Sequence, residues 1–109
     1  MVERLFNPFT PKELMAAADD PEERAAALVR LGMATRDLYY RGAFLRIKAA
    51  MLDVTAHQSI RLASIQAAEY TNCAKFVKPL ERVADEGEPD DVHVVRLHAQ
   101  VLLAGWGYR

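Results

Sequence analysis

Cysteine and long apolar runs are scarce in the 109-residue chain, and their scarcity excludes several classes of protein. The single cysteine, Cys73, cannot form an intramolecular disulfide or a CxxC metal site. No segment approaches the ~20 apolar residues of a membrane span. Residues 1–10 carry charges and a proline where a secretion signal would be apolar. We therefore expect a cytoplasmic protein that makes no membrane contact.

Residues that could carry catalysis or bind a metal are also few. The three histidines, His57, His93 and His98, have no HExxH or HxxE spacing. No base or orienting group is suggested for Cys73, which we expect to be a buried structural thiol. The sequence has no glycine-rich phosphate loop, and its acidic clusters are typical of helix starts and turns. We therefore expect no enzymatic activity, no metal and no cofactor.

Helix-capping and helix-breaking residues recur at short intervals and predict an all-α fold of five to six short helices. Thr10 and Asp20 each precede a proline, as N-cap residues often do. Gly32 offers a left-handed stop, and Ser59 is the next expected N-cap. The predicted helices cover about 11–18, 21–31, 35–54, 60–72, 79–85 and 91–105. The predicted organisation is an arm over 1–10, one helical domain over 11–105 and a tail over 106–109.

Two of these helices have an open alternative. The fifth either opens at Pro79 or begins near Cys73 and is kinked at Pro79. Residues 92–103 alternate between apolar and polar, as a half-buried strand would, but they also fit a helix. We favour the helix, because a lone strand would have no pairing partner and because acidic residues precede the segment and Gly105 follows it.

An arginine near a helix start, followed by small and aliphatic residues, occurs three times. These residues are Arg24, Arg61 and Arg96, spaced by 37 and then 35 positions. The pattern resembles HEAT-type helical repeats, whose units are pairs of antiparallel helices of about this length. The resemblance implies a short solenoid over 11–105. An irregular helical bundle is the alternative that the same helices allow.

The ending of the chain carries a second resemblance. After an acidic linker it reads VRLHAQVLLAGWGYR, from Val95 to Arg109. This stretch is similar to part of phage terminase small subunits, helical proteins that assemble into rings and recognise packaging DNA. The resemblance implies a ring-forming, DNA-binding packaging protein as the alternative function.

The segment 35–54 carries two apolar stripes when it is wound as a single helix. The stripes are Leu38, Leu45, Ala49 and Leu52 and, roughly opposite, Tyr40, Phe44, Ile47, Met51 and Val54. A helix with two apolar faces is either the central helix of the fold or contributes one stripe to a subunit interface. Gly42, inside this segment, predicts close packing or a bend.

Charge is unevenly distributed along the chain. Residues 1–34 carry 4 basic and 6 acidic side chains, 35–84 carry 8 and 4, and 85–109 carry 2 and 5. The basic middle and the aromatic ends predict a contact surface. The candidate partner-binding residues are Arg36, Tyr39, Tyr40, Arg41, Arg46 and Lys48 for polar contacts, and Phe6, Phe9, Trp106 and Tyr108 as apolar anchors. We therefore expect a small interaction protein that binds a protein partner or copies of itself, with nucleic acid a less favoured partner.

Overall fold

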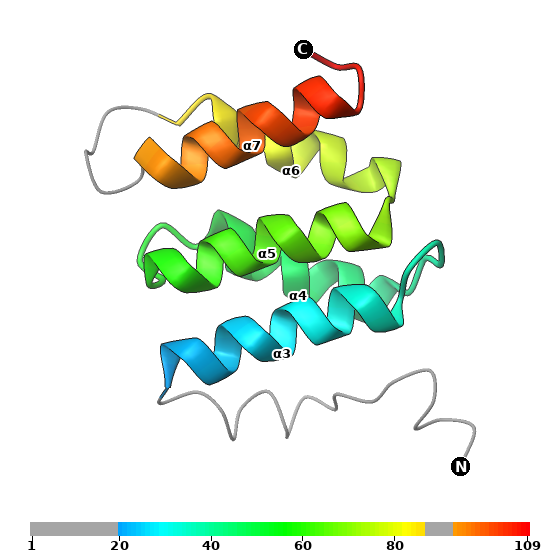
Figure 1. Cartoon of the computed structure of the whole chain (residues 1–109), viewed down its shortest axis with the longest axis vertical. Helices are drawn as coiled ribbons and strands as arrows, with labels where there is room; N and C mark the ends of the chain where they lie inside the picture. The colour runs from blue at the N-terminus through cyan, green and yellow to red at the C-terminus, as the bar shows by residue number, and fades with distance from the viewer. Residues whose placement is uncertain (1–19, 87–92) are drawn as a thin grey trace.

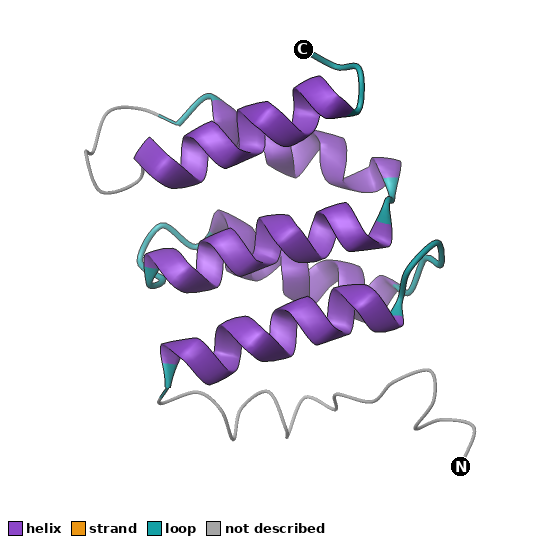
Figure 2. Ribbon diagram, viewed as in Figure 1, coloured by secondary structure: helices purple, strands orange, loops and turns teal. Residues whose placement is uncertain are grey.

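The computed structural model describes residues 20–86 and 93–109 of the chain. Every regular element within these ranges is a helix, as the sequence predicts (Figure 2). The elements are α3 (Pro21–Ala34), α4 (Arg41–Leu52), α5 (Gln58–Thr71), the 3-10 helix η1 (Ala74–Phe76), α6 (Val77–Ala84) and α7 (His93–Gly105). The predicted arm over 1–10 and the predicted helix over 11–18 lie outside the described residues.

The helices form two layers (Figure 1). Helices α3, α5 and α7 lie side by side in one layer, here called the front layer, while α4 and η1–α6 form the rear layer. The chain runs in one direction along the front helices and in the opposite direction along α4 and α6. Helices α4 and α5, and likewise α6 and α7, are therefore antiparallel pairs, the arrangement that the HEAT-type resemblance implies.

Local signals account for the ends of the front helices. Asp20 begins α3, because its Oδ1 accepts a hydrogen bond from the Glu22 backbone N–H at 2.9 Å and a proline follows it. The predicted cap of α5, Ser59, is wrong by two residues. His57 holds that position, and its Nδ1 accepts from the Ser59 N–H at 3.1 Å. Asn72 ends α5 in the left-handed conformation, at φ 52°.

The predicted long helix over 35–54 is wrong at its start. Helix α3 continues to Ala34, and the Thr35 hydroxyl donates to the Leu31 carbonyl at 2.9 Å, so Thr35 belongs to the end of that helix. Asp37 then adopts φ 58°, and its N–H donates to the Thr71 carbonyl at the end of α5. Because a left-handed residue cannot continue an α-helix, α4 begins only at Arg41.

Two glycines have roles other than those predicted. Gly32 does not end a helix but lies inside α3 and is buried against α5. A Cβ at this position would lie 2.6 Å from the Ala67 Cα, so only glycine permits the observed approach of the two helices. Gly42 is exposed in the first turn of α4 and a Cβ there would meet nothing within 4 Å, so the predicted close packing is absent.

The last two helices resolve the open alternatives. The fifth helical run begins at Ala74, directly after Cys73, as one of the two alternatives had it: η1 comes first, α6 follows from Val77, and Pro79 is the third residue of α6. A proline is tolerated there because the first N–H groups of a helix have no carbonyl partner within it. The segment from His93 to Gly105 is the helix α7, as favoured, and not a strand.

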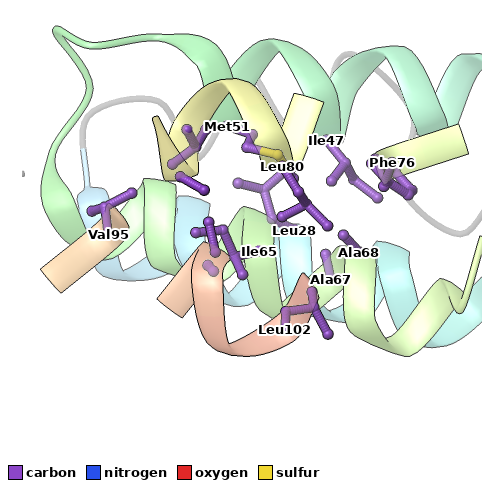
Figure 3. Packing of buried hydrophobic residues seen from close by; sticks show 14 of the residues in the cluster. Leu28, Ile47, Met51, Ile65, Ala67, Ala68, Phe76, Leu80, Val95 and Leu102 are labelled. Carbon is purple, nitrogen blue, oxygen red and sulfur yellow. The ribbon is translucent and has the colours of Figure 1, made fainter. Parts of the chain in front are cut away.

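The core lies between the layers, and α5 is its central helix (Figure 3). Helix α5 packs on α3, α4 and α7, and most of its residues are buried. Of the two predicted stripes on α4, Ile47 and Met51 point into the core, whereas Leu45 of the other stripe is exposed. Helix α4 is therefore not the central helix, and its second stripe is divided: Leu45 and Ala49 are exposed, whereas Leu52 packs against the core.

The three recurrent arginines share one register, since each is the fourth residue of its front helix. Arg61 is buried and donates from Nε and Nη2 to the Met51 carbonyl near the end of α4, at 3.0 and 2.8 Å. Arg96 donates to the Glu86 carbonyl just beyond α6, at 3.1 Å. In both described pairs the arginine of the second helix thus binds carbonyl groups at or just beyond the C-terminal end of the first.

Candidate interaction surface

The charges of the rear layer are almost all of one sign. Its helices carry six basic residues and a single acidic one, Glu81. The basic residues are Arg41, Arg46, Lys48, Lys75, Lys78 and Arg82. By contrast, α3 carries two acidic and two basic residues, and α5 carries one of each. Within the described part of the chain, none of the six basic side chains forms an ion pair.

The loop between α3 and α4 presents aromatic side chains beside these charges. Its conformation is fixed by two hydrogen bonds, from the Asp37 N–H to the Thr71 carbonyl at 3.1 Å and from the Leu38 N–H to the Thr35 carbonyl at 3.0 Å. Tyr39 and Tyr40 follow and are exposed, and the backbone of Tyr40 is extended. Neither tyrosine belongs to a helix. The predicted stripe that included Tyr40 therefore begins only at Phe44.

Tyr39 is one end of a short row of rings that leads into the core. Its ring centroid lies 5.9 Å from that of Phe44, and Phe44 lies 4.8 Å from the buried Phe76. The Lys75 Nζ lies 4.9 Å from the Tyr39 ring centroid, and the Lys48 Nζ lies 5.8 Å from that of Phe44. Both distances suit cation–π attraction, so two ammonium groups flank one aromatic pair. We call Tyr39, Phe44, Lys48 and Lys75 the basic–aromatic cluster.

The structure brings only some of the predicted contact residues together. Tyr39 and Lys48 belong to the cluster, and Arg41 and Arg46 lie on the same rear-layer helix as Lys48. The predicted Arg41–Lys48 alignment places both on one side of α4, since they are seven residues apart, whereas Arg46 lies on another side. Tyr40 precedes α4 as its N-cap residue.

The remaining predicted residues lie elsewhere. The Arg36 Nε lies 3.9 Å from the Asp37 Oδ2. Arg36 also lines a shallow hollow with Glu69 and Tyr70 of the front layer. Trp106 is half-buried against the core at the end of α7, and Tyr108 is exposed beyond it. Phe6 and Phe9 lie outside the described residues.

Sequence reasoning missed Lys75, and it placed Phe44 on a stripe without assigning it a contact role. The Lys75–Tyr39 pair joins residues of different elements, whereas Phe44 and Lys48 are four residues apart on α4, a spacing that places their side chains on one face of the helix. The available signal was the spacing of Lys75 and Lys78 around Phe76, which alternates charge and aromatic character. That spacing alone does not say which ring the lysine will face.

Two of the three histidines and Cys73 have side chains in the part of the chain that the structure describes. The His57 ring caps α5, and the His98 Nδ1 lies 2.8 Å from the Val94 carbonyl within α7. Cys73 is half-buried where full burial was expected, and it forms no disulfide. Over residues 20–86 and 93–109, no group of three or more His, Cys, Asp and Glu side chains could hold a metal ion.

The pKa of the Asp53 carboxyl is lowered, and the cause is local. The Thr55 hydroxyl and then the Thr55 backbone N–H, donating to Asp53 Oδ1 at 2.6 and 3.0 Å, hold the pKa of the Asp53 carboxyl below its ordinary value. This turn follows α4 and is exposed. The lowered pKa therefore reflects the ordering of a turn and not an acid–base site.

Comparisons of the chain with protein-family models, with curated proteins and with solved structures found no match. Among the described helices none is both long and apolar enough to cross a membrane. The chemistry of the surface is therefore the basis on which a function is inferred.

Proposed function

We propose that this chain is a non-enzymatic helical interaction protein whose rear layer binds an acidic surface of a protein partner. The observation that carries the proposal is the six-to-one excess of basic side chains on α4, η1 and α6, none of which is neutralised by an ion pair among the described residues. A surface of one sign steers an oppositely charged partner toward itself and disfavours partners of the same sign.

The basic–aromatic cluster can supply binding affinity that charge alone does not. An exposed ion pair contributes ~0–1 kcal/mol, so a few lysine contacts give little affinity by themselves. Tyr39 adds exposed ring surface that a partner can bury, and its contacts with Phe44 and Lys75 hold it in place before binding. A pre-ordered aromatic side chain loses less conformational entropy on binding. Tyr39 is therefore the expected anchor of the interface, with lysines around it.

The HEAT-type resemblance concerns the fold, and the terminase-type resemblance concerns the function; both are proposals. The shared register of Arg24, Arg61 and Arg96 supports the HEAT-type resemblance. The terminase-type alternative, a DNA-binding protein, is favoured by the same basic layer, because phosphates also attract lysine and arginine and bases stack on exposed aromatic rings. The experiment below separates a protein partner from nucleic acid.

The test compares two charge-reversed double variants. Arg41→Glu with Lys48→Glu alters the rear layer, and Arg30→Glu with Arg36→Glu makes the same change of charge outside it. Each immobilised protein is used to capture binding proteins from native lysate, and far-UV circular dichroism confirms that each is folded. We expect a set of acidic proteins that the wild type and the control variant retain and that the rear-layer variant loses.

A DNA retardation assay at low salt uses the same three proteins, because phosphate contacts are strongest there. A DNA shift that disappears in the rear-layer variant, without any change in captured proteins, would support the DNA-binding alternative. Unchanged capture together with no DNA shift would reject the rear layer as a binding surface.

A further inference from the structure

The outward face of α7 carries an apolar stripe, with the exposed His98 beside it. Val94, Leu97, Val101 and Ala104 follow one another at spacings of 4 or 3 residues, so they form a single stripe, and all four are exposed. The opposite face of the helix, with Val95 among its residues, is buried in the core (Figure 3). Helix α7 is thus apolar on two faces, of which the fold covers one.

The stripe continues into a groove between α7 and α5. This groove has a volume of about 600 Å³ and a mixed lining, in which the polar Gln66, Glu69 and His98 stand among apolar residues that include Leu62, Val101 and Trp106. Because Val101 belongs to both, the stripe and the groove make one continuous surface, here called the α7 face. Helix α7 is also the last helix of the front layer: α5 lies on one side of it, and no described helix lies on the other (Figure 1).

The α7 face carries almost no charge. The only formally charged residue of α7 is Arg96, which is half-buried and donates to the Glu86 carbonyl. Glu69 and His98 line the groove, and both are exposed, so solvent can screen the Glu69 charge. An interface centre depleted of charge and rich in aliphatic side chains is typical of associations between copies of one chain.

The distribution of charge indicates which partner this face fits. A twofold interface sets one patch against the same patch of the second copy, so a strongly charged patch repels itself. The rear layer, with six basic residues and one acidic residue, is unsuited to such an interface. The α7 face is both apolar and nearly uncharged, so it can meet its own copy without repulsion.

We propose that the α7 face is a homodimer interface, in which α7 of one copy packs against α7 of the second across a twofold axis. Burial of Val94, Leu97 and Val101 supplies the driving force. The rear layers of both copies stay outward, so the dimer does not depend on the acidic partner proposed above and would present two basic surfaces to it.

The first experiment measures molar mass by sedimentation or light scattering from about 5 to 500 µM, a range that includes weak specific association. We expect the wild type to approach twice its 12.2 kDa as concentration rises. Val101→Glu and Leu97→Glu should remain monomeric. The matched controls are Val54→Glu and Leu45→Glu, because Val54 is 63% exposed like Val101, and Leu45 is 45% exposed against 46% for Leu97.

A second experiment tests the symmetry in full-length chains that carry Cys73→Ser. Each chain carries one further substitution, Leu97→Cys, Val101→Cys or the control Val54→Cys. After mild oxidation, non-reducing electrophoresis separates covalent dimers from monomers. A residue that lies close to a twofold axis contacts the same residue of the second chain. At least one of the variants Leu97→Cys and Val101→Cys should therefore give a covalent dimer. The Val54 cysteine should not.

Three outcomes would overturn the proposal: a monomeric wild type over the whole range, a dimer that Val101→Glu and Leu97→Glu leave intact, or a dimer in which neither α7 cysteine crosslinks. The rear-layer variant Arg41→Glu with Lys48→Glu should dimerise normally. Loss of partner capture and loss of the dimer are therefore distinguishable.

Discussion

The ion pair between Arg61 and Glu86 makes the sharpest prediction about stability. The Arg61 side chain is 1% exposed and Glu86 18%, and their bidentate contact has N–O distances of 3.1 and 2.5 Å. Glu86→Ala leaves the buried guanidinium without its counter-charge. Breaking a buried pair in this way costs ~3–5 kcal/mol. Because Glu86 is partly hydrated, we expect the lower end, about 3 kcal/mol.

Arg61→Met retains the length of the side chain and removes the charge. It leaves the Met51 carbonyl without two donors, a loss of ~1–3 kcal/mol, while Glu86 can turn toward water. If the two residues act as a unit, the double variant should lose no more than Glu86→Ala alone. The coupling energy would then be about 2 kcal/mol. The free energy of unfolding of a domain of this size is ~5–15 kcal/mol, so the stability of every variant should remain measurable.

The assay is urea denaturation followed by far-UV circular dichroism, with equal m-values required for the comparison. The control is the neighbouring ion pair between Asp85 and Arg109, whose N–O distance is 2.9 Å but whose side chains are 65% and 35% exposed. Asp85→Asn should cost less than ~1 kcal/mol, because solvent already screens that pair. Additive losses, or a Glu86→Ala variant as stable as Asp85→Asn, would refute the reasoning that burial makes the Arg61 pair matter.

Three further predictions concern two glycines and one turn. Gly32→Ala should destabilise the fold by ~3 kcal/mol or more in the same denaturation assay, because its Cβ would lie 2.6 Å from the Ala67 backbone. Gly42→Ala should instead stabilise α4 by ~0.5–1 kcal/mol, and a loss there would contradict the open surroundings of that residue. Thr55→Val should raise the pKa of Asp53 toward its ordinary value in an NMR titration, because the hydroxyl is the main cause of the lowering. Since a lowered pKa contributes stability that is lost as pH falls through it, the variant should lose less stability on acidification.

The helices were predictable where their ends depend on neighbours in the sequence. Asp20 before Pro21 determines the start of α3 without help from the rest of the chain. The pattern of residues 92–103 fits both the strand period and the helix period. The helix was predicted because a lone strand would have no pairing partner, and that prediction is confirmed. Local signals of this kind carry the all-α class and the antiparallel pairs.

The errors occur where a tertiary contact overrides a local pattern. Residues 35–40 have helical periodicity, yet the Asp37 N–H is held by the Thr71 carbonyl, 34 residues along the chain, and the left-handed turn excludes a helix. Gly32 resembles a stop signal, but its position is determined by Ala67 on the neighbouring helix. Neither contact can be inferred from spacing along one helix.

The arginine pattern was visible in the sequence, but its physical meaning was not. Arg61 is placed by its register to bind the end of α4, and its second partner, Glu86, lies 25 residues away. Arg96 repeats the first of these contacts at the end of the next rear helix. In the two described pairs, the arginine of the front helix therefore binds carbonyl groups at the end of the rear helix before it, which leaves the outward side chains of the rear layer free to be basic without disturbing the packing. The same chain can thus carry one face that repels its own copy and another that does not, because the arginines that hold the layers together are removed from both.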